Sequence, residues 1–290
     1  MNMKRRFRVG AVKRRRRWDE DSADNFPLPY EPSTHEEKIL EYFGGKAMGG
    51  SPNPHFRIIP SVFICFTNRC GSNFIAEQLA STGKLPVAGE SFNWPQAVKF
   101  SERMGAKSLR HFCELLVEKH SKNGVFASKV GWAQLYFLCR TKLIPEVFGI
   151  PRFIHVRRLD LLGQAISFVI AKQTGAWSSK IVSDKKPQYD AAAIAARLEM
   201  TATANARFEV LFSRFGYPQL EVVYEHFLQQ DGQGVDAITE WLGLGRSRVN
   251  PRKTQLRPQR DTLNEEWRAR FLSEQQAFFA SMAAPGANGQ

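Results

Sequence analysis

The sequence predicts an α/β fold in which a parallel sheet carries helices on both faces. From residue 57 onward, short apolar runs alternate with amphipathic helical patterns, as in strands joined by crossover helices. Polar residues also gather where two of these runs lead into helices, and such sheets bind ligands at the carboxyl ends of their strands. The chain has 290 residues, which suits one main domain.

Each predicted strand is a short run of apolar, mostly β-branched or aromatic residues followed by a polar stretch. These runs are residues 62–66, 125–130, 152–156 and 220–224. Apolar side chains spaced three or four residues apart predict the helices between and after them. The predicted helices cover residues 73–81, 109–120, 133–141, 160–174, 189–215, 235–244 and 262–279.

Residues 1–57 are predicted to be a basic, largely disordered extension, because they lack the apolar density for a core of their own. Within this extension, Ile39, Leu40 and Phe43 share a face and predict a short helix over residues 36–43. The catalytic domain is then expected over residues 58–284, followed by a flexible tail at residues 285–290.

The charge of the chain lies mainly at its start. Residues 1–17 contain nine Lys or Arg and no acid, out of a net charge of +13, which leaves about +4 for the rest. Such a block is expected to be a solvated arm. Contact with an anionic membrane surface and binding of nucleic acid are the two functional alternatives.

Composition excludes several classes of protein. No apolar run approaches the roughly 18–20 residues of a bilayer span, and the basic start is not followed by the apolar segment of a secretory signal. The four cysteines and six histidines show no metal-ligand spacing, so no metal site is predicted. A cytoplasmic protein is expected, with a place at the inner face of the membrane, through residues 1–17, as an alternative.

The first polar junction resembles a phosphate-binding loop without its lysine. The stretch SVFICFTNRCGSNF places Gly71 at the second glycine of a Walker motif, but Phe66 and Ser72 then replace its first glycine and its lysine. Hydrolysis of ATP or GTP with magnesium is therefore not expected. An anion cradle remains, although a tight turn with a capped helix explains the same residues.

In this cradle, Arg69 supplies a cation, Gly71 lets the backbone approach, and Ser72 and Asn73 offer donors at a helix start. Cys70 lies beside Arg69, and a reactive thiolate there is an alternative.

The second junction is FIHVRRLDLLGQAIS, in which Arg158 follows a buried strand and Asp160 is placed to cap the next helix. Ser167 and Gln164 share a face of that helix. Arg158 and Ser167 can converge on a second phosphate; alternatively, Arg158 pairs with Asp160 and Ser167 bonds a backbone carbonyl. A 5′ phospho group at the first junction and a 3′ phosphate at the second suggest a doubly phosphorylated adenosine.

Five motifs, in order, resemble those of the bacterial sulfotransferases typified by trehalose 2-sulfotransferase, which are related to lipopolysaccharide and Nod-factor sulfotransferases. They are Arg69-Cys70-Gly71-Ser72-Asn73, then Thr82-Gly83 with Gly89-Glu90, Ser128 through Gln134, Arg157 through Thr174, and Asn264-Glu265-Glu266-Trp267. The resemblance runs from about residue 58 to 279. It implies a P-loop-like three-layer fold of the sulfotransferase type.

The resemblance also implies the sulfuryl donor 3′-phosphoadenosine 5′-phosphosulfate (PAPS) and no metal. By carry-over, residues 69–73 hold the 5′ phosphosulfate, whereas Arg158 and Ser167 hold the 3′ phosphate. Arginines and backbone N–H groups then stabilise the leaving charge without magnesium.

On the acceptor side, Asn93 stands where the resemblance implies a catalytic glutamate. Glu90 is therefore the predicted general base, because Asn is not a useful proton acceptor. Lys129 is expected to neutralise the bridging oxygen or orient the acceptor. The predicted acceptor contacts are Asn93, Trp132, Gln134 and Gln164, with core packing as the alternative for Trp132.

These features predict PAPS-dependent transfer of a sulfuryl group to a hydroxyl of a carbohydrate or glycolipid. A small-molecule kinase with a degenerate phosphate loop, a noncatalytic sulfotransferase-like protein, and a nucleic-acid-binding protein that uses the arginine-rich tail are the alternatives. The identity of the acceptor and the formation of a homodimer stay open at this point.

Overall fold

The computed structural model describes residues 32–44, 52–178, 181, 183–230, 232–256 and 262–283. The basic residues 1–17 and the C-terminal residues 285–290 lie outside this part, so what the sequence predicts for them stays a prediction.

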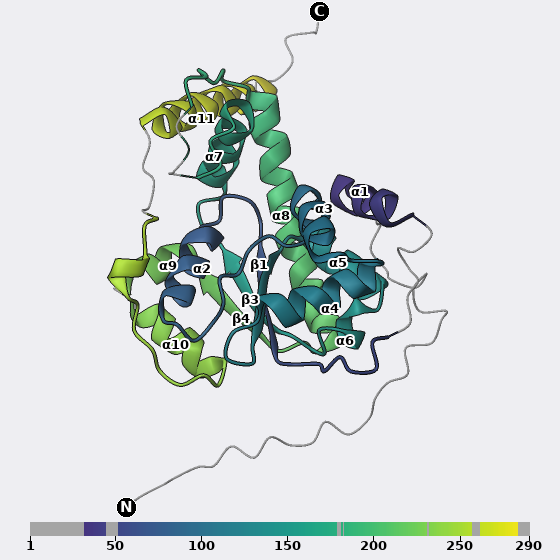
Figure 1. The fold of residues 1–290 in the computed structure, drawn as a ribbon. Helices are drawn as coiled ribbons and strands as arrows, with labels where there is room; N and C mark the ends of the chain where they lie inside the picture. Colours follow the sequence, from purple (N-terminus) through teal and green to yellow (C-terminus); the bar gives the residue numbers. More distant parts are fainter. Residues whose placement is uncertain are drawn as a thin grey trace, which may run out of the picture. The chain divides into compact units, whose positions relative to one another are not determined.

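The predicted parallel sheet flanked by helices is confirmed (Figure 1). The described residues form four parallel strands in the order β2-β1-β3-β4: β1 (Ser61–Phe66), β2 (Phe126–Val130), β3 (Arg152–Arg157) and β4 (Gln219–Val223). Every residue of β1 is buried, because helices cover both faces of the sheet. The apolar runs therefore located all these strands to within one residue.

Helices follow the strands in the alternation that the sequence predicts. They are α2 (Ser72–Ser81), α3 (Trp94–Met104), α4 (Leu109–His120), α5 (Trp132–Arg140), α6 (Leu143–Glu146), α7 (Leu161–Thr174), α8 (Ala191–Phe215), α9 (Tyr224–Gln229), α10 (Gln233–Trp241) and α11 (Thr262–Ala283), with a 3₁₀ turn at Pro251–Lys253. The sequence patterns did not predict α3, α6 or α9. Helix α3 was not predicted because its buried residues, Ala97 and Ser101, form no apolar stripe in the sequence.

The two faces of the sheet have different cores. Helices α2, α9 and α10 pack on one face, where Ile64 and Ile154 meet Ile75 and Ile238. The other face is aromatic, and Phe63 lies with its ring centroid 5.3 Å from that of Phe148. Figure 1 shows α8 running along this second face.

A third apolar cluster joins α7, the start of α8 and α11, which lie side by side at the top of Figure 1. Ile166, Ile194 and Trp267 are buried in it. None of the helices in the described part of the chain combines the length and the hydropathy of a bilayer-spanning segment.

The compact unit begins at Pro32, earlier than the boundary at residue 58 that the sequence suggests. The predicted short helix is α1 (Thr34–Phe43), whose Ile39 and Phe43 are buried. This helix has too few apolar residues to form a core of its own. Instead, Phe43 packs against Phe112 of α4. Low apolar density therefore marked α1 as an extension, although it belongs to the compact unit.

Candidate active site

The loop between β1 and α2 carries the residues that the sequence predicts to form an anion cradle. Arg69 and Gly71 both have left-handed backbones, with φ of 68° and 88°. A Cβ on Gly71 would lie 2.1 Å from the ring of Tyr224, which packs against the loop from the start of α9. Gly71 is thus required for its φ and for space. Helix α2 begins directly after Gly71 and has no side-chain cap, as the predicted anion site at its N-terminus requires.

Cys70 serves the turn of this loop. Its N–H donates to the carbonyl of Thr67 at 3.2 Å, and its side chain is buried. Burial raises the pKa of the thiol, which argues against the reactive thiolate. The predicted contact of Cys70 with the donor stays a prediction, as do those of its neighbours Ser72 and Asn73.

The second junction meets the first directly. Arg69 Nε donates to Ser167 Oγ at 2.9 Å, and Arg69 Nη1 donates to the carbonyl of Trp177 at 2.7 Å. The guanidinium that the sequence assigned to the 5′ phosphosulfate therefore lies with the serine assigned to the 3′ phosphate. The residues that the sequence assigns to two separate phosphates are therefore in direct contact.

Arg158 contacts the backbone of the loop between β1 and α2. Its Nη1 donates to the carbonyl of Arg69 at 3.3 Å, and its Nη2 lies 3.4 Å from Asp160, as in the structural alternative for this pair. Asp160 also caps α7 and binds Arg268. Burial opposes ionisation of Asp160, but the hydrogen bonds from Arg268 and Gly163 outweigh it and lower its pKa.

The guanidinium group of Arg69 feels the charge of Arg158, although Arg158 also lies 3.4 Å from Asp160 and 3.8 Å from Glu225. Burial, followed by the nearby charge of Arg158, lowers the pKa of Arg69. Two guanidinium groups held this close repel each other, and a bound anion relieves that repulsion. The residues present therefore fit a ligand with several negative charges.

The predicted catalytic pair comes together at the other end of the cradle. Lys129, near the end of β2, is buried, and its Nζ lies 2.9 Å from Oε1 of Glu90. The same ammonium donates to Asn73 Oδ1 at the start of α2 and lies over the ring of Phe66. Lys129 thus connects the anion loop to the predicted base.

The backbone next to Glu90 is hydrogen-bonded to β2. The carbonyl of Gly89 accepts from Lys129 N at 2.8 Å and from Ser128 Oγ at 3.0 Å. The Glu90 side chain is 31% exposed, and within the described residues its Oε2 has no hydrogen-bond partner. That oxygen is available to a substrate hydroxyl.

The predicted acceptor contacts lie mostly inside the protein. Trp132 packs edge-on against Phe208, and Gln134 Oε1 accepts from Gly131 N at 2.9 Å. Gln164 is fully buried and its Nε2 donates to Thr67 Oγ1 at 2.8 Å, which supports the anion loop. Asn93 is half-buried at the start of α3. For these four residues, contact with an acceptor stays a prediction.

Sequence reasoning missed Arg197 of α8. Its Nη2 donates to Asn68 Oδ1 at 3.1 Å, and its guanidinium stacks 3.6 Å from the ring centroid of Phe168. Burial lowers its pKa to about 10. Arg197 adds a further cation beside the anion loop. No local motif could have found it, since only the packing of α8 on α7 brings it to Asn68.

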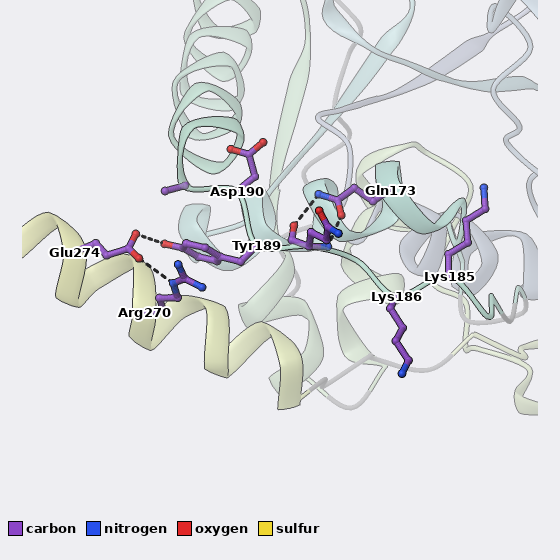
Figure 2. Close-up of a pocket in the computed structure, with 9 residues that line it drawn as sticks. Gln173, Lys185, Lys186, Tyr189, Asp190, Arg270 and Glu274 are labelled. Carbon is purple, nitrogen blue, oxygen red and sulfur yellow. Dashed lines mark hydrogen bonds and ion pairs between the residues drawn. The ribbon is translucent and has the colours of Figure 1, made fainter.

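A cavity lies away from these residues, in another part of the described structure (Figure 2). Its volume is about 790 Å³, and it lies between the end of α7, residues 185–190 and α11. Its wall is already paired internally, because Glu274 accepts from Tyr189 at 2.7 Å and from Arg270 at 2.8 Å. None of the predicted site residues lines this cavity.

Comparison with known proteins agrees with this arrangement. Residues 61–274 match the Stf0 sulphotransferase family. The chain belongs to this family. It is also 25% identical, over 259 residues, to the trehalose 2-sulfotransferase of Mycolicibacterium smegmatis, an alignment that covers 75% of this chain and 96% of that protein. The resemblance inferred from the motifs is therefore confirmed, and the protein is a sulfotransferase.

Proposed function

We propose that the protein transfers a sulfuryl group from PAPS to a hydroxyl of a carbohydrate or glycolipid. The observation that carries the proposal is the bridge by Lys129, whose ammonium contacts both the anion loop, at Asn73, and the proton acceptor Glu90. A group that is transferred from the donor at the anion loop to an acceptor at Glu90 has to pass a side chain that contacts both. Membership of the Stf0 family and the similarity to a sugar sulfotransferase support the reaction class.

The donor is bound by the loop and its basic neighbours. Backbone N–H groups at the start of α2 would bind the 5′ phosphosulfate. We assign Arg69 to the 3′ phosphate together with Ser167, in place of the 5′ phosphosulfate that the sequence suggests for it, because its Nε donates to Ser167 Oγ. Arg158 supports the backbone of Arg69 and adds its charge. PAPS, when bound there, supplies an activated sulfuryl group whose transfer leaves adenosine 3′,5′-bisphosphate.

Glu90 and Lys129 then divide the work at the reacting atoms. The free Oε2 of Glu90 accepts the proton of the acceptor hydroxyl, which makes its oxygen a nucleophile toward sulfur. Lys129 stabilises the charge that develops on the departing phosphate oxygen. Arg197, which donates to Asn68 of the same loop, adds positive charge to its rim.

The direct test is transfer of radiolabelled sulfate from PAPS to a panel of sugars, glycolipids and lipopolysaccharide fragments. We expect a labelled product that forms equally well in EDTA, because the Walker Ser/Thr and acid that hold magnesium have no counterparts in this loop. Calorimetry should show tighter binding of adenosine 3′,5′-bisphosphate than of ADP. Preference for ADP, with activity that EDTA abolishes and magnesium restores, would instead favour the kinase alternative.

A further inference from the structure

Helix α1 lies outside the residues that match the family, yet it is firmly attached to the catalytic unit. It contacts α3 and α5. Glu36 is 1% exposed and forms an ion pair with Arg140 of α5, while Ile39 is equally buried. A helix anchored by a buried charge pair and an apolar side chain has a fixed position relative to its neighbours.

This anchoring brings His35 to the start of α3. The N–H of Trp94, the first residue of α3, donates to His35 Nδ1 at 3.2 Å. Asn93 occupies the N-cap position but forms no side-chain cap. The cap of α3 is thus an imidazole from another helix, some sixty residues away in the chain.

The bond also defines the protonation state of His35. Accepting an N–H uses the lone pair of Nδ1, so the proton of the neutral ring lies on Nε2. Burial lowers the pKa of His35 more than the charge of Glu90 raises it, which keeps the ring neutral near pH 7. His35 then has no lone pair to take a proton from a substrate, and the role of base stays with Glu90.

The segment that carries Glu90 is hydrogen-bonded to other parts of the protein at both of its ends. Asn93 N donates to the carbonyl of Glu90 at 3.0 Å, which makes residues 90–93 one turn leading into α3. At its first end the carbonyl of Gly89 is bonded to β2. At its second end, Trp94 N is bonded to His35.

We propose that His35 is a positioning residue: by capping α3, helix α1 holds the turn that carries Glu90 in place beside Lys129. Helix α1 then helps to fix the geometry of the acceptor side. The effect on turnover rests on the proposed function, whereas the effect on the turn does not.

The experiment compares three substitutions of His35. His35→Ala removes the acceptor. In His35→Asn the amide oxygen takes the place of Nδ1, and in His35→Gln it takes the place of Nε2 instead. The matched control is His111→Ala, because His111 Nδ1 also accepts a backbone N–H, from Lys107 at 3.2 Å, on the exposed side of α4.

In full-length protein, we expect His35→Ala and His35→Gln to lower kcat about fivefold to tenfold, the size of a lost helix cap. Affinity for adenosine 3′,5′-bisphosphate should not change, and His35→Asn should restore kcat. Hydrogen exchange at the Trp94 amide should be about tenfold faster in His35→Ala and His35→Gln than in the wild type. It should be normal in His35→Asn and His111→Ala.

Equal kcat and equal exchange in wild type and His35→Ala would overturn the proposal, as would rescue by Gln in place of Asn. If the wild-type protein transfers no sulfate, the proposed function fails, but the exchange measurement still decides whether His35 holds the turn.

Discussion

The donor side and the acceptor side of the site are built in different ways. Most of the donor side is one continuous piece of chain, residues 66–73, whose shape follows from a buried strand, a left-handed glycine and a helix start. The acceptor side takes Glu90 from a turn, Lys129 from β2 and, through Trp94, a bond from His35 of α1. Backbone geometry thus determines the donor side, whereas contacts between distant segments determine the acceptor side.

This difference predicts separable effects of mutation: changes on the donor side should affect nucleotide binding, and changes on the acceptor side should affect turnover. The largest effect is expected at Glu90. Glu90→Gln should lower turnover roughly 10²–10⁴-fold, the usual loss for a general base. The affinity for adenosine 3′,5′-bisphosphate should stay within about twofold, because the carboxylate faces the acceptor.

Steady-state kinetics and calorimetry check this, with Glu102→Gln on the exposed side of α3 as the control. Near-normal turnover of Glu90→Gln with a genuine acceptor would remove Glu90 as the base.

The next largest effect concerns the 3′ phosphate. Arg69→Ala should weaken adenosine 3′,5′-bisphosphate by about 1.5–3 kcal/mol, a charge-assisted bond, with a smaller loss for adenosine 5′-phosphate. Ser167→Ala and Arg158→Ala should show the same preference with smaller losses. Calorimetry with both nucleotides measures it, and equal losses for the two would contradict the assignment.

Gly71→Ala tests whether the backbone shapes the donor side. The methyl group would meet the ring of Tyr224 at 2.1 Å, so the loop has to shift, at a cost of about 1–3 kcal/mol in donor affinity. Gly83→Ala is the matched control, because Gly83 also has positive φ, 77°, but nothing lies within 4 Å of its added Cβ. Adding Tyr224→Ala to Gly71→Ala should recover part of the affinity. Equal binding by the two glycine variants would show that close packing is not the constraint.

The core beneath both sides should respond to pH. Burial, with help from the charge of Arg157, lowers the pKa of His155 from 6.5 to about 4. Between these values the unfolded chain binds the proton more readily, so stability is lost as pH falls through this window. At pH 5 the loss is about 2 kcal/mol relative to pH 8.

Urea denaturation at both pH values measures this loss, and His155→Leu should remove that part of the pH dependence. An unchanged difference between the two pH values in the variant would show that other groups cause it.

The smallest effect is expected at Asn93. Because its side chain forms no cap, Asn93→Ala should change the free energy of unfolding by less than about 0.5 kcal/mol. Ser108→Ala should cost about 1 kcal/mol, since Ser108 caps α4 through a 3.1 Å bond from His111 N. Thermal denaturation compares the two. A larger loss at Asn93 would mean that it, and not His35, stabilises the start of α3.

The sequence by itself determined the strands, most helices and the glycine turn between β1 and α2, because these depend on local rules. A run of buried residues forms a parallel strand, apolar spacing forms a helix, and a glycine before a helix start leaves N–H groups free for an anion. The sequence also singled out Glu90 as the candidate base, since it alone among residues 89–94 can accept a proton near neutral pH, and this role stays a prediction.

Only the tertiary structure decided which side chains meet. It joined Arg69 to Ser167, about a hundred residues apart, which the sequence assigned to separate phosphates. It placed Arg197 against the loop and His35 against α3, for which no motif exists. The physical reason is that parallel strands bring their carboxyl ends to one edge whatever lies between them, while the side chains that reach that edge depend on how helices pack.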